Sequence, residues 1–160
     1  MTVLALGQEA LLARLSLLGA RPDLVFAAVL AWGMLRGSAE GMVWAFIGGL
    51  VLDLLSGGPM GGMTLALLLI ALLAGRRWGR ELTPVGLQVF LLGLGLGFLY
   101  HLLLLTILAW SGAAVDWAYD LARVAAPSAI ANGLLSVLLY PALAWLDRRT
   151  RAEGLTFDEA

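Results

Sequence analysis

Three polar side chains stand inside long apolar stretches of this sequence and are the first candidates for chemistry. Asp53, His101 and Asn132 are each flanked by runs of apolar residues. An ionisable or polar group in such a run is costly to bury and normally finds a polar partner. A carboxylate, an imidazole and an amide that meet in an apolar core can either hold helices together or line a cavity for a small ligand.

Other kinds of chemistry are excluded by what the sequence lacks. It has no cysteine and one histidine, which excludes disulfides, thiolate sites and multi-histidine metal sites. Neither a Gly-x-Ser-x-Gly nucleophile elbow nor a Gly-rich phosphate loop occurs. A net charge of −1 gives no basic field for nucleic acid. We therefore expect no enzyme activity, no cofactor, no metal and no nucleic-acid partner.

The composition is that of a protein built mostly of membrane-embedded segments. The 160 residues are 61% hydrophobic and 13% charged, with a mean hydropathy of +0.93. A soluble domain of this size leaves much of its surface exposed and cannot hide so many apolar side chains. The runs are apolar on every face, which indicates helices rather than strands. The sequence predicts an all-α, polytopic integral membrane helix bundle.

Six segments are candidate transmembrane helices of a single domain that covers residues 1–160. A span needs about 20 mostly apolar residues. The approximate segments are 1–19, 22–36, 38–55, 60–75, 84–110 and 126–146, with a tail at 147–160. The first segment is atypical because Glu9 and Arg14 interrupt it. The alternatives are therefore six spans, which we favour, or five.

Arginines assign the two sides of the membrane, because cytoplasmic loops carry an excess of basic residues. Arg76, Arg77 and Arg80 place the loop at 76–83 in the cytoplasm. Further arginines after residue 147 place the tail there too. With six spans, both termini are cytoplasmic.

The depths of the three polar side chains agree. At about 1.5 Å per residue, Asp53 lies roughly 22 Å from the inner start of its segment, and His101 roughly 25 Å. Asn132 lies about 21 Å up a bilayer core of roughly 30 Å. We therefore predict that the three form one buried polar cluster, with Tyr100 or Ser128 as additions. The alternative is that each is satisfied separately by backbone or interfacial water.

Small residues are spaced for close helix packing. Pairs four residues apart let helix backbones approach in lipid, either inside the bundle, which we favour, or at a partner face. The pairs are Gly93 and Gly97, Gly37 and Gly41, Gly58 and Gly62, and Ala45 and Gly49. Between flanking glycines, Pro59 predicts a tight outer turn that begins the next helix.

The loop at 111–125 is the only sizeable external element. Asp116, Trp117, Tyr119, Asp120 and Arg123 predict a short interfacial helix with an aromatic face. Two interpretations stay open: an aromatic anchor at the membrane surface, or a contact for a partner protein.

The run from Phe46 to Gly61 resembles the signature of the MreD family of rod shape-determining proteins. That family carries glycine-leucine, here at Gly49, then an aspartate three residues after the leucine, here Asp53. A proline-x-glycine turn follows, here Pro59 and Gly61.

Three further positions extend the resemblance over nearly all of the chain. Residues 21–24, Arg-Pro-Asp-Leu, are similar to the motif that begins the family's second helix. Gln8 fits a glutamine often found at the end of its first helix, and Asn132 an asparagine of its last helix. A longer apolar stretch usually precedes that glutamine, whereas only seven residues precede Gln8 here.

The resemblance implies a non-catalytic scaffold subunit of the bacterial elongation (Rod) complex in the inner membrane. Such a subunit binds MreC and works with MreB filaments, a SEDS glycosyltransferase and a class B penicillin-binding protein in lateral peptidoglycan synthesis. The resemblance also implies a fold similar to the S-components of energy-coupling-factor transporters. The alternative function is therefore a vitamin-binding or transport subunit, whose polar residues would line a water-filled cavity of roughly 300 Å³ or more.

Overall fold

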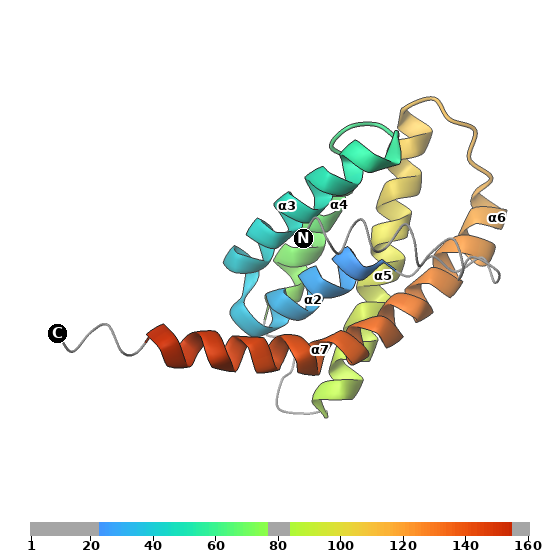
Figure 1. The fold of residues 1–160 in the computed structure, drawn as a ribbon. Helices are drawn as coiled ribbons and strands as arrows, with labels where there is room; N and C mark the ends of the chain where they lie inside the picture. Colours follow the sequence, from blue (N-terminus) through green and yellow to red (C-terminus); the bar gives the residue numbers. More distant parts are fainter. Residues whose placement is uncertain (1–22, 77–83, 155–160) are drawn as a thin grey trace.

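The computed structural model describes residues 23–76 and 84–154, which form a bundle of helices (Figure 1). The candidate first span at 1–19 lies outside the described residues. Within the described ranges every regular element is a helix, as the composition predicts. The elements are α2 (Leu24–Arg36), α3 (Ser38–Ser56), α4 (Gly62–Ala74), α5 (Val85–Trp110), α6 (Trp117–Asp120), a π-helical turn η2 (Leu121–Ala125) and α7 (Ala126–Gly154).

Most helix ends lie within two residues of those expected, and the last helix is the exception. The apolar run ends at residue 146, but α7 continues to Gly154. Much of the expected tail at 147–160 is therefore helical. Asp147 is buried against the bundle rather than exposed in a tail, and it pairs with Arg36 of α2.

Among the residues that the structure describes, three helical stretches are long and apolar enough to cross a membrane. They are α3, α5 and the continuous run Trp117–Thr150 that includes α7. Both α2 and α4 have 13 residues, about 20 Å of helix against a hydrocarbon core of about 30 Å. The count of six spans therefore stays a prediction.

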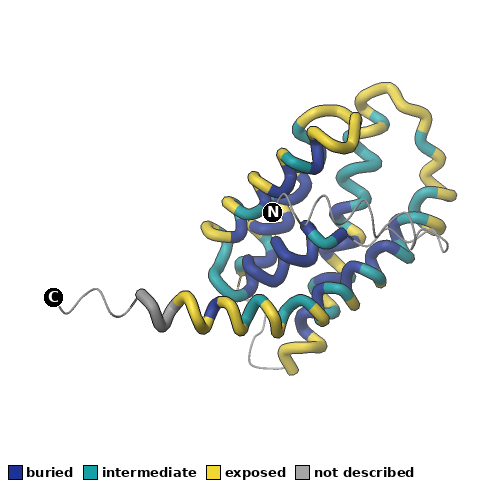
Figure 2. The backbone as a smooth tube through the Cα atoms, viewed as in Figure 1, coloured by how far each residue is buried: buried dark blue, intermediate teal, exposed yellow. Residues whose placement is uncertain are grey.

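The short helix α2 forms the centre of the bundle. Every residue from Val25 to Met34 is buried, and α2 contacts α3, α4, α5 and α7. Figure 2 shows α2 as the most continuously buried helix. A helix enclosed by other helices can be shorter than the bilayer, because protein rather than lipid surrounds its ends.

Small residues make the closest helix crossings, and these crossings lie inside the chain. A Cβ atom on Gly49 of α3 would lie 2.5 Å from the Cα of Thr64 in α4. A Cβ on Gly93 of α5 would lie 2.8 Å from the Cα of Gly133 in α7. Gly97 faces Ala129 in the same crossing. At these positions the structure confirms internal packing as the role of the small residues.

Two short elements, α6 and the π-helical turn η2, connect the loop after α5 to α7. Asp116 caps α6 by accepting a hydrogen bond from the Tyr119 backbone N–H at 3.1 Å, so the predicted short helix is present. The π-helical turn η2 then joins α6 to α7. Pro141 lies inside α7, which changes direction along its length (Figure 1). Proline explains such a bend because it cannot donate the helical hydrogen bond.

Candidate functional site

The buried carboxylate of Asp53 joins α3 to the beginning of α4. One oxygen accepts a hydrogen bond from the Met63 backbone N–H at 2.9 Å. The other accepts from the Thr64 backbone N–H at 3.0 Å and from the Thr64 hydroxyl at 2.6 Å. Asp53 is only 3% exposed, so protein donors replace water around this carboxylate.

The position of Asp53 has a simple physical reason. The first N–H groups of a helix have no partner within the helix, and the helix dipole favours a negative charge there. The N-cap of α4 is Gly61, which has no side chain to accept these hydrogen bonds. Asp53 of the preceding helix supplies the missing cap.

The turn between α3 and α4 places the two helices for this contact. Gly57 ends α3 with φ 65° and Gly61 precedes α4 with φ 90°, a region that favours glycine. Pro59 lies between them, and its carbonyl accepts from the Gly62 N–H at 3.2 Å. The glycine, aspartate and Pro-x-Gly positions of the sequence signature therefore build one fastened helical hairpin, with Gly49 at its closest crossing.

A second buried polar site forms around Asp23, the N-cap of α2. Its carboxylate accepts from the Phe26 backbone N–H at 2.9 Å and from the Tyr100 hydroxyl at 3.1 Å. Its own backbone N–H donates to the side-chain oxygen of Asn132 at 2.7 Å. Asp23 therefore connects α2 to α5 and α7.

Within the expected cluster of Asp53, His101 and Asn132, these hydrogen bonds separate Asp53 from Asn132. Asp53 bonds to the start of α4, whereas Asn132 bonds to Asp23. Equal depth in the bilayer does not decide which neighbour a side chain faces, because that depends on rotation about the helix axis. Tyr100, considered only as an addition, is a central partner.

Asp23 is the residue that the cluster prediction missed. Its signal was present in the sequence, since an aspartate directly before an apolar run is a typical helix cap. Thr64 was also missed, and no local signal marks it.

His101 lies between the two polar sites. Its Nδ1 is 2.9 Å from the Gly97 carbonyl oxygen, and its ring meets Tyr100 edge-on at 5.5 Å between centroids. His101 and Asp53 both line a pocket of about 310 Å³. The remaining walls are formed by the α3–α4 turn, by the beginning of α4, by apolar residues of α5, and by Val124 and Ala125 of η2.

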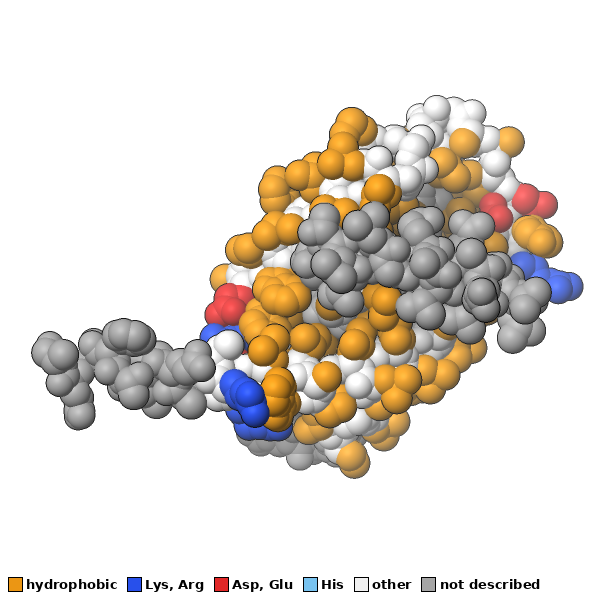
Figure 3. Space-filling model, in the orientation of Figure 1, with side chains coloured by type: hydrophobic (Ala, Val, Ile, Leu, Met, Phe, Trp, Pro, Cys, Tyr) orange, Lys and Arg blue, Asp and Glu red, His pale blue; other side chains and the backbone are white. Residues whose placement is uncertain are grey.

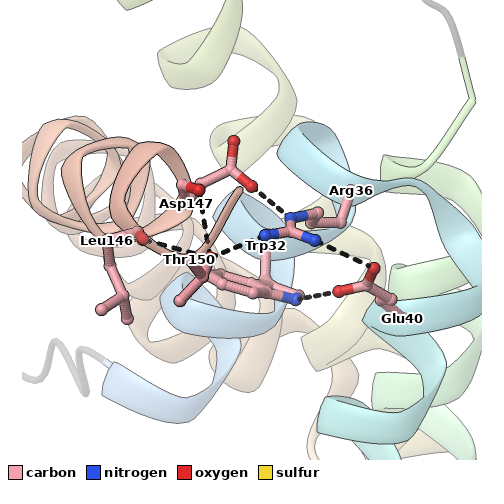
Figure 4. Close-up of polar contacts among 6 residues, drawn as sticks. All are labelled: Trp32, Arg36, Glu40, Leu146, Asp147 and Thr150. Carbon is pink, nitrogen blue, oxygen red and sulfur yellow. Dashed lines mark hydrogen bonds and ion pairs between the residues drawn. The ribbon is translucent and has the colours of Figure 1, made fainter. Parts of the chain in front are cut away.

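The opposite end of the bundle holds a network around Arg36 (Figure 4). Arg36 forms ion pairs with Asp147 of α7 and with Glu40 of α3, the latter at 3.5 Å. It also donates to the Thr150 hydroxyl at 2.7 Å. The Trp32 indole N–H donates to Glu40 at 3.2 Å, beneath the Arg36 guanidinium. We call this set the Arg36 network; it fastens α2 to α3 and α7.

The residues of the outer loop form an exposed surface. Trp117 is 42% exposed and Tyr119 60% exposed, with Asp116 and Arg123 also exposed and Asp120 half-buried. Acidic and basic side chains lie close together at this end of the molecule (Figure 3).

Comparison with known proteins identifies the family. The family model of rod shape-determining protein MreD matches residues 1–149. Comparison with curated proteins and with solved structures finds no match. The family match contains both the α3–α4 hairpin and the Asp23 site. The chain therefore belongs to the MreD family of rod shape-determining proteins.

Proposed function

We propose that this chain is a non-catalytic membrane scaffold of the bacterial elongation complex, with MreC as its direct partner. MreB, a SEDS glycosyltransferase and a class B penicillin-binding protein belong to the same assembly. The chain lies in the inner membrane with both termini in the cytoplasm. Its contribution to lateral peptidoglycan synthesis and rod shape is to hold partners in position.

The observation that carries this proposal is that the two buried carboxylates are occupied by hydrogen bonds within the protein. Asp53 has three protein donors and Asp23 has two. Each carboxylate fastens one helix to another. Carboxylates held in this way stabilise one fixed shape of the bundle. A scaffold needs such a shape, because it acts only by binding its partners.

The outer-loop surface is the contact that we assign to MreC. Tryptophan, tyrosine and arginine are the residues that most often dominate binding energy at protein interfaces. Trp117, Tyr119 and Arg123 supply all three types, beside Asp116 and Asp120. The small residues of the helix crossings are less suited to this role, because the chain's own helices already occupy them.

The test is co-purification of the full chain with MreC in detergent, followed by measurement of affinity and stoichiometry. Trp117→Ala combined with Tyr119→Ala should weaken the complex by about 2 kcal/mol or more, a factor of about 30. Phe46→Ala is the matched control, because Phe46 is a similarly exposed aromatic residue on α3, at 53%. Equal weakening by both changes would refute the assigned surface. Absence of any complex would refute the scaffold.

Small-molecule binding is the second candidate, and the pocket beside Asp53 is the observation that favours it. Its volume of about 310 Å³ reaches the lower end of the range for ligand sites. Leu104→Trp would fill the pocket from its α5 wall. If thermal stability rises with a vitamin-like molecule in the original chain but not in this variant, the pocket is a ligand site. If neither responds, the second candidate is rejected.

A further inference from the structure

Between Trp145 and Arg149, helix α7 places its acidic side chain and its two basic side chains on different faces. Residues three and four apart share a helix face, so Trp145, Arg148 and Arg149 lie together. Asp147 lies on the opposite side, 7% exposed, where it pairs with Arg36 of α2. The acidic side chain is therefore used inside the Arg36 network.

The basic side chains are left on the outside. Arg148 and Arg149 are exposed, and neither forms an ion pair with a carboxylate in the described part of the chain. Figure 3 shows basic side chains beside hydrophobic ones near the C-terminal segment. The outer face of this helix end thus carries two positive charges next to apolar surface.

The aromatic ring of Trp145 stacks against the guanidinium group of Arg149. The Arg149 guanidinium carbon lies 4.0 Å from the centroid of the Trp145 ring, and Trp145 is 49% exposed. Stacking occupies the face of a guanidinium and leaves the N–H donors along its edge available. Those donors match the two oxygens of a phosphate group. Tryptophan itself favours the headgroup level of a bilayer.

We propose that Trp145, Arg148 and Arg149 form a binding site for the headgroup of an anionic phospholipid such as phosphatidylglycerol. Charge complementarity selects this occupant, because Arg148 and Arg149 are exposed while the adjacent Asp147 is turned inward. The location agrees, since Arg36, the last residue of α2, pairs with Asp147 and so places this part of α7 at one end of the bundle. The bound lipid would fix the depth of this helix end. The site does not depend on MreC binding.

The experiment is native mass spectrometry of the full chain in mild detergent, titrated with phosphatidylglycerol or phosphatidylcholine. A basic residue near an anionic surface contributes about fivefold in affinity. Arg149→Gln should therefore weaken phosphatidylglycerol binding about fivefold, and Arg149→Gln with Arg148→Gln about 25-fold. Binding should also fall with added salt. Phosphatidylcholine binding should not change.

Arg123→Gln is the matched control, because it removes one exposed arginine at the other end of the molecule. It should leave lipid selectivity unchanged. Thermal unfolding of each variant checks that the fold is intact. Equal affinity for the two lipids, or equal losses in Arg149→Gln and Arg123→Gln, would overturn the proposal. Binding of an acidic peptide without selective binding of phosphatidylglycerol would also overturn it.

Discussion

At the scale of single residues, both buried aspartates solve the same problem. Asp53 and Asp23 each accept hydrogen bonds from the first N–H groups of a helix. These N–H groups have no hydrogen-bond acceptor in their own helix. In an apolar core, no water is present to act as the acceptor instead. The cost of burying a carboxylate is offset by donors that would otherwise be unsatisfied.

Removing the Asp53 carboxylate should therefore destabilise the fold, because buried N–H groups would lose their acceptor. We expect Asp53→Ala to lower the free energy of unfolding by about 1–3 kcal/mol, because the Met63 and Thr64 N–H groups lose their acceptor. Asp53→Asn keeps one acceptor oxygen and should lose less. Thermal unfolding in detergent measures both. Equal loss in the two variants would contradict the capping role.

The hydrogen bond between Tyr100 and Asp23 should behave as a coupled pair. Tyr100→Phe removes only the hydroxyl. It should lower the free energy of unfolding by about 0.5–1.5 kcal/mol, the usual net value of a hydrogen bond, and by more if the carboxylate acceptor strengthens the bond. Asp23→Ala also removes the cap of α2 and should cost more. In a double-mutant cycle the two losses should be less than additive. Additive losses would show that the two side chains do not interact.

At the scale of elements, the bundle depends on two close crossings and on the Arg36 network. The α3–α4 crossing uses Gly49, and the α5–α7 crossing uses Gly93. Arg36 fastens the other end of α2 to α3 and α7. Polar contacts at both ends of α2 and backbone contacts along the neighbouring helices leave little freedom between elements.

Two glycines on α5 allow a matched test of the crossing. A Cβ on Gly93 would meet the backbone of Gly133 at 2.8 Å, whereas one on Gly95 would meet nothing within 4 Å. We expect Gly93→Ala to destabilise the fold by about 1–3 kcal/mol, the usual cost of overpacking. Gly95→Ala should be neutral or stabilising by up to about 1 kcal/mol, because alanine favours the helix. Similar thermal unfolding of the two variants would contradict the crossing.

At the scale of the whole molecule, the helices α2, α3, α4, α5 and α7 alternate in direction (Figure 1), and the two ends of the bundle differ in charge. The end with Arg36 also carries Arg76, Arg148 and Arg149. The other end carries the α3–α4 turn, the outer loop and the pocket. In the topology that we propose from the positive-inside rule, the first end is the one expected to face the cytoplasm.

Cysteine labelling tests this orientation without interference, because the chain contains no cysteine. Ser111→Cys places a thiol in the outer loop, and Ala39→Cys places one at the arginine-rich end; both positions are exposed. A membrane-impermeant maleimide should label the first variant in intact cells. The second should react only after permeabilisation. The reverse pattern would invert the proposed topology.

The sequence by itself determined the helical class, most helix limits and the turn between α3 and α4. These features are local: the length of an apolar run limits a helix, and Pro59 with its flanking glycines favours a turn over a helix interior. The signature from Gly49 to Gly61 also pointed to the family that the comparison established.

Tertiary structure alone decided which polar groups meet. Depth along a helix follows from residue number, but the direction in which a side chain points follows from how helices rotate and cross. Asn132 therefore bonds to Asp23, 109 residues away, rather than to Asp53 at similar depth. Arg36 likewise pairs with Asp147, 111 residues away, which lies past the apolar run but within helix α7. Such contacts depend on the packing of the whole bundle, which no local pattern in the sequence encodes.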